Sequence, residues 1–255
     1  MPPEGAPAWA LVPDWPAGGR VGALMSTRAG GTSAPPFDSL NLGRAAGDDP
    51  AAVDENRRRF VAALGGATPR WLSQVHGRAV VRLWAADAAA QAPQADASIT
   101  TDPGLACVVT VADCLPVLFA APGGRGVGAA HAGWRGLAAG VLEASVDALC
   151  EAAACAPGEV CAWLGPCIGP RQFEVGADVL EACGGGPRFV ERPRPEGQQR
   201  WLADLPGLAF DRLRAAGVTR LSGGAWCTVE DRSRFFSFRR DGVTGRMAAA
   251  VWIER

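Results

Sequence analysis

The chain has 255 residues, with 25 basic against 26 acidic side chains and 48% hydrophobic residues. This length and apolar content suit a domain with a sizeable core, and the balanced charge argues against a disordered chain or a protein that coats nucleic acid. All basic residues are Arg, because the sequence contains no Lys, which excludes Schiff-base chemistry, lysine-anchored pyridoxal phosphate and the P-loop lysine. The sequence has two histidines, His76 and His131, so any imidazole chemistry must draw on that pair.

The N-terminal segment and the cysteines predict a reduced, cytoplasmic protein. Residues 1–19 have no basic start and are interrupted by Pro, so we expect an irregular segment rather than a signal peptide. No apolar run approaches the roughly 20 residues that a membrane span needs. The eight cysteines include no CxxC pair, and most are expected to be small buried apolar residues. We therefore expect one domain over residues 1–255, with neither a membrane nor a nucleic acid as a partner.

Helical signals occur at several places along the chain. The stretch 49–65 begins with an N-cap Asp, has Pro at the first helical position and ends at Gly, which predicts a helix. Apolar residues recur at helical spacing over 137–155, where Pro and Gly follow and end the pattern. Shorter helices are expected near 176–183 and 205–216.

Short β-rich runs between these helices predict strands over 21–26, 79–84, 105–111, 116–120, 126–130, 160–164 and 249–254. Several runs are apolar throughout, which is typical of strands that are buried on both faces. Three of the runs fall between 105 and 130 and leave no room for a helix, so a steady alternation of strand and helix is excluded. We predict an α+β domain with a central mixed β-sheet, which can be two-layered, flanked by helices.

His76, Cys114 and His131 each lie at the end of a predicted strand, beside Gly or Asp. Loops carried by a rigid sheet can bring such positions together, although the spacings are too wide for a zinc finger. Three ligands of the His2Cys kind leave one position of a tetrahedral Zn²⁺ open, which is the arrangement of a catalytic site. An ion held in this way acts as a Lewis acid and activates water at neutral pH.

Two other interpretations use the same side chains. Cys114 can act as a thiolate nucleophile with His131 or His76 as its base. Alternatively, the histidines are ordinary polar residues whose hydrogen bonds are satisfied within the fold. Spacing does not separate these interpretations, whereas the metal content of the protein does.

Turn-like segments carry polar groups that suit an anion. Arg28 and Asn41 lie in STRAGG and SLNLG, Arg135 lies in GWRG close to His131, and Arg240 lies in FFSFRRDG. Without lysine, a phosphate must be held by guanidinium groups or by backbone amides, although each arginine can equally be a solvated surface residue. The aromatic side chains that could stack on a planar base, or fill the core instead, are Phe37, Trp71, Trp134 and Phe173.

Taken together, the segments STRAGGTS, PFDSLNLG, LSQVHG, ADCLPVL, AHAGWRGL, WLGPCIGP, FFSFRRDG and TGRMAA resemble a known family. It was once described as multicopper polyphenol oxidoreductase or laccase, and its members are now described as purine nucleoside phosphorylases, one of them as a peptidoglycan-editing factor. The resemblance covers residues 20–254. It implies an α+β fold with a sandwiched sheet and one catalytic zinc ion bound by His76, Cys114 and His131.

The resemblance also implies an activity. Adenosine, inosine and methylthioadenosine would react with phosphate to give the free base and ribose 1-phosphate or its methylthio analogue, and adenosine would be deaminated to inosine. Phosphate would lie against C1′ of the ribose, because an anion there offsets the positive charge that develops on the sugar. The residues expected to act in catalysis are Asp113, Arg28, Asn41 and Arg135, and those expected to bind substrate are Gln74, Phe37 and Arg240. Asp113 is a candidate proton shuttle, and its alternative is a loop residue hydrogen-bonded to the backbone.

The number of histidines excludes laccase chemistry. A multicopper oxidase needs a histidine-rich trinuclear cluster in addition to a His2Cys copper centre, and one His2Cys site uses both histidines of this chain. A single copper ion in that site remains compatible with the sequence. Two further functions remain open: hydrolysis of an amide or peptide bond in a cell-wall precursor, and non-catalytic, metal-dependent quality control of muropeptide intermediates.

Overall fold

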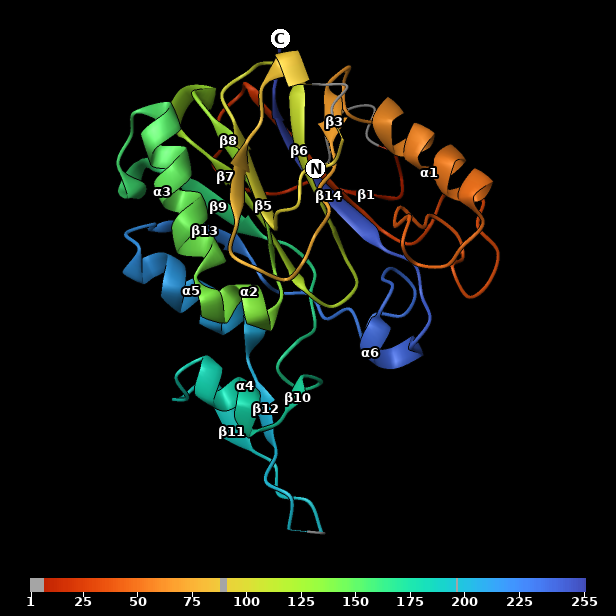
Figure 1. The fold of residues 1–255 in the computed structure, drawn as a ribbon, viewed down its shortest axis with the longest axis vertical. Helices are drawn as coiled ribbons and strands as arrows, with labels where there is room; N and C mark the ends of the chain where they lie inside the picture. Colours follow the sequence, from red (N-terminus) through yellow and green to blue (C-terminus); the bar gives the residue numbers. More distant parts are fainter. Residues whose placement is uncertain (1–6, 88–90, 196) are drawn as a thin grey trace.

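Two β-sheets lie face to face in the computed structural model, which describes residues 7–87, 91–195 and 197–255 (Figure 1). Helix α1 (Pro50–Ala62) covers the outer side of one sheet, and helices α3 (Val141–Ala153) and α5 (Leu205–Ala215) lie on the outer side of the other. The arrangement confirms the predicted α+β class with a mixed, two-layered sheet.

The first sheet has the strand order β1-β2-β14-β6-β3. Its strands are β1 (Ala10–Leu11), β2 (Val21–Ser26), β14 (Met247–Ile253), β6 (Leu105–Val111) and β3 (Thr68–Arg70). The pairs are antiparallel except for β3 with β6, which run parallel. Strand β1 lies within the segment that we expected to be irregular, because Ala10 and Leu11 pair with the end of β2; residues 1–6 of that segment lie outside the described residues.

The second sheet has the strand order β13-β9-β7-β8-β5-β4. Its strands are β13 (Arg220–Gly223), β9 (Cys161–Leu164), β7 (Leu115–Ala120), β8 (Val127–Ala132), β5 (Ala97–Thr100) and β4 (Val80–Arg82). The edge pairs β13 with β9 and β4 with β5 are parallel, and the inner pairs are antiparallel. The sequence pattern predicted β4, β7, β8 and β9 but missed β5 and β13.

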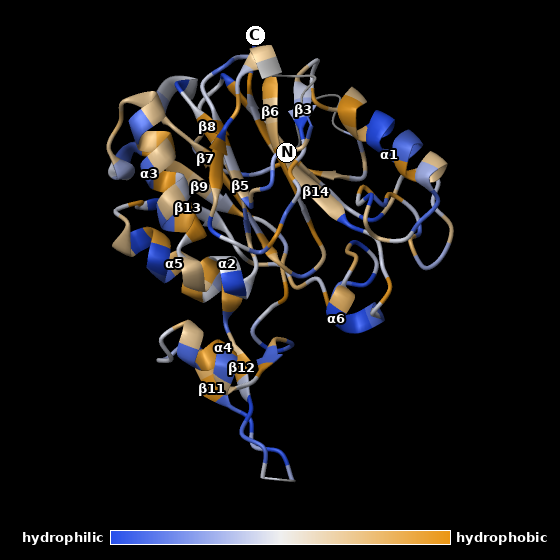
Figure 2. Cartoon of the chain, viewed as in Figure 1, coloured by the Kyte–Doolittle hydropathy of each residue, from blue (hydrophilic) through white to orange (hydrophobic). Residues whose placement is uncertain are grey.

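The apolar strands are buried on both faces, as their composition predicts. In β6, Cys107 and Val109 face the space between the sheets, whereas Val108 packs under α1 with Phe60. The second sheet divides its side chains in the same way between the inter-sheet core and the helices outside it. Figure 2 shows these central strands as mainly hydrophobic, whereas hydrophilic and hydrophobic residues alternate along α1.

The helical segment predicted over 137–155 is two helices, α2 (Trp134–Ala139) and α3. Gly140 separates them with a left-handed backbone, φ +93°, which glycine adopts without the steric cost of a Cβ. The first of these helices therefore begins three residues after His131 and lies close to the end of β8. The other predicted helices are confirmed as α1, α4 (Ala177–Ala182) and α5.

A small sheet with the order β10-β12-β11 extends from the sandwich below α4 (Figure 1). Its strands are β10 (Glu174–Val175), β12 (Trp201–Ala203) and β11 (Phe189–Glu191). The remaining elements are helix α6 (Phe238–Asp241) and the 3-10 turns η1 (Ala85–Asp87), η2 (Pro122–Gly124) and η3 (Pro157–Glu159). Among the described residues, no helix has both the length and the apolar character needed to cross a membrane.

Candidate metal centre

The side chains of His76, Cys114 and His131 meet in the structure, as the sequence predicted. One potential ligand atom from each residue lies within 4.8 Å of the others. The two imidazole rings meet edge to face, with their centroids 4.8 Å apart and an interplanar angle of 79°. Two nitrogen donors and one sulfur donor therefore converge on a single point.

His76 and Cys114 lie on two connections that lead from the first sheet to the second. His76 follows β3 and precedes β4, and Cys114 lies in the bend between β6 and β7. His131 belongs to β8 and is paired with Pro116 of β7, so it lies one strand away from the Cys114 bend. His131 is thus held within a strand and Cys114 directly before one, whereas His76 lies in the longer loop between β3 and β4.

Asp96 contacts the segments of both histidines, and the sequence analysis did not identify it. It directly precedes β5, is fully buried, and its Oδ1 lies 2.9 Å from Nδ1 of His131. Its carboxylate also accepts the backbone amides of Val75, His76 and Gly77. The hydrogen bond with His131 helps to lower the pKa of this carboxyl against the opposing effect of burial.

The electrostatics of the thiol and the imidazole reinforce each other. Burial by itself raises the pKa of Cys114, but the charge of His131 and the hydrogen bonds with both histidines outweigh it and lower the pKa to about 6. Burial likewise opposes protonation of His131, whereas the Cys114 thiolate and Asp96 raise the pKa of its imidazole to about 9. The metal-free site therefore favours a thiolate paired with an imidazolium. A divalent cation that binds here would find the thiolate already formed and would displace the proton from the imidazolium.

The space beside the donors is kept open by a glycine. A Cβ at Gly133 would lie 2.9 Å from Sγ of Cys114 and 3.3 Å from Cδ2 of His76. Any other residue at this position would push against both donor side chains. Two imidazoles and a thiolate suit Zn²⁺ in both ligand type and number, with one tetrahedral position left for a further ligand.

A hollow with a volume of about 270 Å³ opens next to this cluster and is lined by His76 and Cys114. Its other lining residues are Ala112, Asp113, Gly133, Trp134, Arg135, Ile168, Phe173, Leu205, Phe238 and Arg239. Aromatic and aliphatic side chains thus form most of the wall, and guanidinium groups provide its positive charge. Of the predicted site residues, the structure brings Asp113, Arg135, His76 and Cys114 to the wall of the hollow, whereas His131 is buried behind it.

The two arginines of the hollow differ in their contacts. Among the described residues, the guanidinium of Arg135 has no hydrogen bond or ion pair and lies over the Trp134 ring at 4.2 Å. Arg239 donates to the carbonyl oxygens of Gln172 and Glu174, and its guanidinium lies 5.5 Å from the centre of the Phe173 ring. The sequence motif FFSFRRDG contains Arg239, but its position beside Arg240 gave no signal as to which of the two faces the site.

Asp113 connects the cysteine bend to the segment that carries α6. One carboxylate oxygen accepts the hydroxyl of Thr228, and the other accepts the backbone amide of Arg239 at 2.6 Å. Its backbone is left-handed, with φ +87°, which directs the chain from one sheet into the other. The side chain thus makes the backbone hydrogen bond that sequence analysis gave as the alternative to a proton shuttle.

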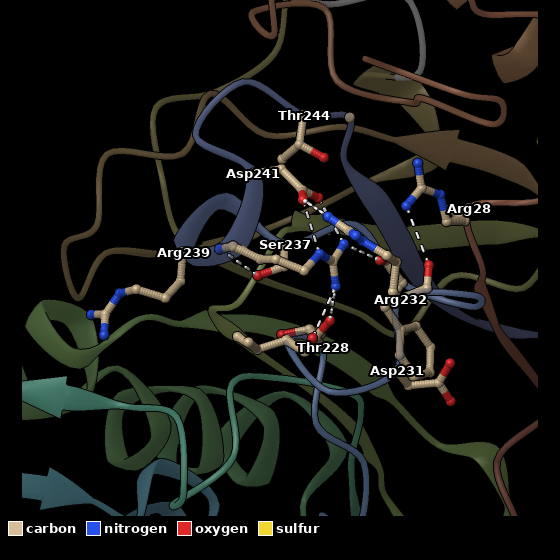
Figure 3. Close-up of polar contacts among 12 residues, drawn as sticks. Arg28, Thr228, Asp231, Arg232, Ser237, Arg239, Asp241 and Thr244 are labelled. Carbon is tan, nitrogen blue, oxygen red and sulfur yellow. Dashed lines mark hydrogen bonds and ion pairs between the residues drawn. The ribbon is translucent and has the colours of Figure 1, made fainter. Parts of the chain in front are cut away.

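Arg28 and Arg240 lie in a different place, in an open groove on the other side of α6. Arg240 donates to the carbonyl oxygens of Thr228, Val229 and Phe235 and forms a bidentate pair with Asp241. Arg28 is held by Asp38 and by the carbonyl oxygen of Arg232. Figure 3 shows Arg28, Arg232 and Asp241 within this set of contacts, whereas Arg239 points away from it.

The other predicted residues are engaged within the protein and lie outside the hollow. Asn41 is buried and accepts the backbone amides of Gly43 and Arg246. Gln74 forms three hydrogen bonds with Thr110 of β6 and so ties the His76 loop to the first sheet. Phe37 is buried, with 8% exposure.

Sequence comparison places the chain in a family and among named relatives. The model of the family described as multi-copper polyphenol oxidoreductase laccase matches residues 22–254. Purine nucleoside phosphorylase PA4543 of Pseudomonas aeruginosa is 51% identical, over 97% of this chain and 99% of its own. Purine nucleoside phosphorylase YfiH of Escherichia coli is 47% identical, over 95% of this chain and 98% of its own.

Solved structures show the same fold. Protein NMB0706 of Neisseria meningitidis superposes with a TM-score of 0.88 at 44% identity, covering 97% of this chain and all of its own. YlmD of Geobacillus stearothermophilus gives a TM-score of 0.87 at 32% identity, covering 96% of each chain. The chain therefore belongs to the multi-copper polyphenol oxidoreductase laccase family, within the group whose relatives are named purine nucleoside phosphorylases.

Proposed function

We propose that this protein is a zinc-dependent purine nucleoside phosphorylase that acts on adenosine, inosine and methylthioadenosine. The observation that supports this most directly is the cluster of His76, Cys114 and His131, of which His76 and Cys114 line a hollow that combines aromatic walls with guanidinium groups. The names of the relatives give the same reaction class. The eight free thiols suit a reducing compartment, and we propose that the enzyme acts in the cytoplasm.

In this proposal His76, Cys114 and His131 hold one Zn²⁺, which supplies a Lewis acid at the edge of the hollow. The aromatic side chains of the wall bind the base by stacking, because the faces of Trp134 and Phe173 are apolar and planar. Phe238, which is 57% exposed, lies at the rim and completes this wall. The hollow thereby removes the nucleoside from water and fixes its orientation.

The phosphate is held by Arg135 and Arg239. Both line the hollow, and Arg135 has its guanidinium donors available for an anion. A phosphate near C1′ of the ribose stabilises the positive charge that develops on the sugar as the bond to the base breaks. We thus assign to Arg239 the role that the sequence suggested for Arg28 or Arg240, since those two are engaged in the groove beyond α6.

In this proposal, four of the predicted residues do not contact the substrate and instead hold nearby loops in place: Asn41, Gln74, Arg28 and Arg240. Gln74 fixes the loop of His76 on β6, and Arg240 fixes the segment that ends in α6. Asn41 binds the backbone of Arg246 just before β14. Phe37 is buried and does not line the hollow, so in this proposal it does not contact the base.

Incubation of the purified protein with inosine and phosphate tests the proposal. We expect release of hypoxanthine and ribose 1-phosphate, with no release when phosphate is omitted or when a chelator has removed the metal. Metal analysis of protein purified without added metal should give one zinc per chain. Retained zinc without hypoxanthine would contradict the phosphorylase and favour hydrolysis or recognition of a cell-wall precursor by the same site.

Deamination of adenosine is the second part of the proposal. It is supported by the same donors, because a Lewis acid with an open position can activate water for attack on C6 of adenine. Asp113 lines the hollow next to Cys114 and is our candidate for proton transfer, a role that requires its hydrogen bond with Thr228 or with the backbone amide of Arg239 to open. Conversion of adenosine to inosine without phosphate tests this part separately, and the absence of inosine would contradict it.

A further inference from the structure

Asp96 is a fully buried carboxylate that lies at the start of β5, directly behind the metal donors. A charged group with no exposure is costly unless its oxygens are satisfied by hydrogen bonds. Among the described residues, its side chain has four partners, and all of them belong to the two histidine segments. This concentration of contacts on one site distinguishes Asp96 from an ordinary turn-forming Asp.

The first set of contacts holds the loop of His76. Three successive backbone amides donate to the Asp96 carboxylate: Val75 at 3.2 Å, His76 at 2.9 Å and Gly77 at 2.7 Å. Successive amides that point into one concavity form an anion-binding nest. His76 has φ +61° within this nest, a backbone conformation that a residue with a side chain adopts only when its surroundings compensate the cost.

The second contact fixes the ring of His131. Oδ1 of Asp96 lies 2.9 Å from Nδ1, and because an ionised carboxylate only accepts, Nδ1 carries the hydrogen. The other ring nitrogen, Nε2, is then the one that presents a lone pair to a metal. The backbone amide of His131 also donates to the carbonyl oxygen of Asp96 at 2.7 Å, so ring and backbone are tied to the same residue.

We propose that Asp96 is the positioning residue of the metal centre, which sets the backbone of one histidine donor and the ring tautomer of the other. The inference rests on the metal site of the proposed function and adds a residue outside the set of donors. One carboxylate thereby couples His76, in the loop between β3 and β4, with His131 of β8, 55 positions further along the sequence. The donors are in place before the ion arrives, so little ordering remains to be done on binding.

The variant Asp96→Asn tests this role, because it keeps the volume but replaces one accepting oxygen by an amide donor. We expect the dissociation constant for Zn²⁺ to rise by about 10- to 100-fold, the loss typical of residues that orient a metal ligand. The constant is measured on the full-length protein by competition with a chromophoric chelator. A variant that folds and binds Zn²⁺ within threefold of the original protein would overturn the proposal.

Asp48→Asn is the matched control. Asp48 also organises a loop through its carboxylate, by accepting the hydroxyl of Ser33 and the amide of Asn41, and none of these residues lines the hollow. We expect it to lower thermal stability without changing the affinity for Zn²⁺. An equal loss of affinity in both variants would mean that Asp96 acts on the stability of the fold alone and would overturn its positioning role.

Nitrogen NMR of the histidine rings provides a readout that survives a failure of Asp96→Asn to fold. The chain has two histidines, so one histidine variant assigns both ring spectra. In the zinc-loaded original protein, we expect His131 to carry its hydrogen on Nδ1 and the metal on Nε2. The opposite tautomer would overturn the proposal. Zinc binding with this tautomer but without inosine phosphorolysis would sustain the inference and contradict the proposed function.

Discussion

Two arginine-bearing regions lie on opposite sides of α6, and they use the same residue type in different ways. In the metal hollow, Arg135 stacks on Trp134 and keeps its hydrogen-bond donors available within the described structure. In the groove beyond α6, Arg240 uses its donors on three carbonyl oxygens and on Asp241. The side chain of Arg240 is only 12% exposed.

The hydrogen-bond partners of an arginine, and not its residue type or sequence motif, therefore decide whether its guanidinium group is available to bind an anion. Arg239 and Arg240 are adjacent in the sequence, yet one lines the hollow and the other fixes the backbone behind it. A guanidinium that already satisfies buried carbonyl groups cannot leave them without a large desolvation cost. We therefore expect substitutions in the groove to change the stability of the fold. Substitutions in the hollow should instead change metal binding, substrate binding and the reaction rate.

The largest effect is expected for Cys114→Ala. Loss of one of three donors should reduce bound zinc to near zero and lower phosphorolysis of inosine by more than about 100-fold, which exceeds the loss typical of changes around a ligand. Metal analysis and a hypoxanthine assay measure both effects. Cys155→Ala, which removes a thiol beyond the end of α3, is the control and should change neither. Full activity of Cys114→Ala would contradict the metal centre.

Arg240→Ala should destabilise the protein more than any other change in the groove. It leaves carbonyl groups of Thr228, Val229 and Phe235 without their donor, and we expect the free energy of unfolding to fall by about 2–4 kcal/mol. Arg232→Ala is the matched control, because this side chain is 73% exposed and its ion pair with Asp241 is worth less than about 1 kcal/mol. Denaturant unfolding measures both, and equal stabilities would contradict the structural role of Arg240.

In contrast to Arg240→Ala, Arg135→Ala should weaken phosphate binding and leave the stability of the fold nearly unchanged. We expect the KM for phosphate to rise by about tenfold or more, because a hydrogen bond to a charged group is lost, while the stability stays within about 0.5 kcal/mol. Arg82→Ala provides the control, since Arg82 also stacks on a tryptophan, Trp84, at 4.0 Å, but does not line the hollow. An unchanged KM in Arg135→Ala would remove the anion-binding role from this residue.

The smallest effect concerns the pH dependence of the metal-free protein. The pKa of Cys114 is lowered to about 6, so its thiolate is present above that pH and is lost as the pH falls through it. Alkylation of Cys114 should therefore have its midpoint near pH 6 rather than near the ordinary thiol value of about 8.5. Mass spectrometry of the labelled peptide measures the profile, and zinc should protect the thiol. A midpoint at the ordinary value would contradict the thiolate–imidazolium pair.

The sequence was sufficient for the regular elements and for the convergence of the donors. Helix α1 follows from its Asp cap, its Pro and its apolar stripe, and the buried strands follow from their continuous apolar runs. The three donors were predicted to meet because His76 precedes a predicted strand, Cys114 follows one and His131 ends one, each beside Gly or Asp. These signals are local, and local signals survive folding when the surrounding packing agrees with them.

The parts that the sequence did not predict depend on contacts between distant segments. Strand β5 has four residues and lacks a clear period, so neither it nor Asp96 was expected. Arg28 finds its carbonyl partner 204 positions away at Arg232, which no local pattern can indicate. The break at Gly140 likewise depends on the left-handed turn between α2 and α3, since the apolar period alone continues through it.

Two of the donors lie on connections between the two sheets, so metal binding should affect how firmly the sheets are held together. His76 lies on the connection from β3 to β4, and Cys114 lies on the connection from β6 to β7. Each of these connections joins the first sheet to the second. An ion bound by these donors would link the two sheets at this end of the sandwich. Loading with zinc should therefore raise the melting temperature of the whole molecule, as expected for a ligand that binds the folded but not the unfolded chain.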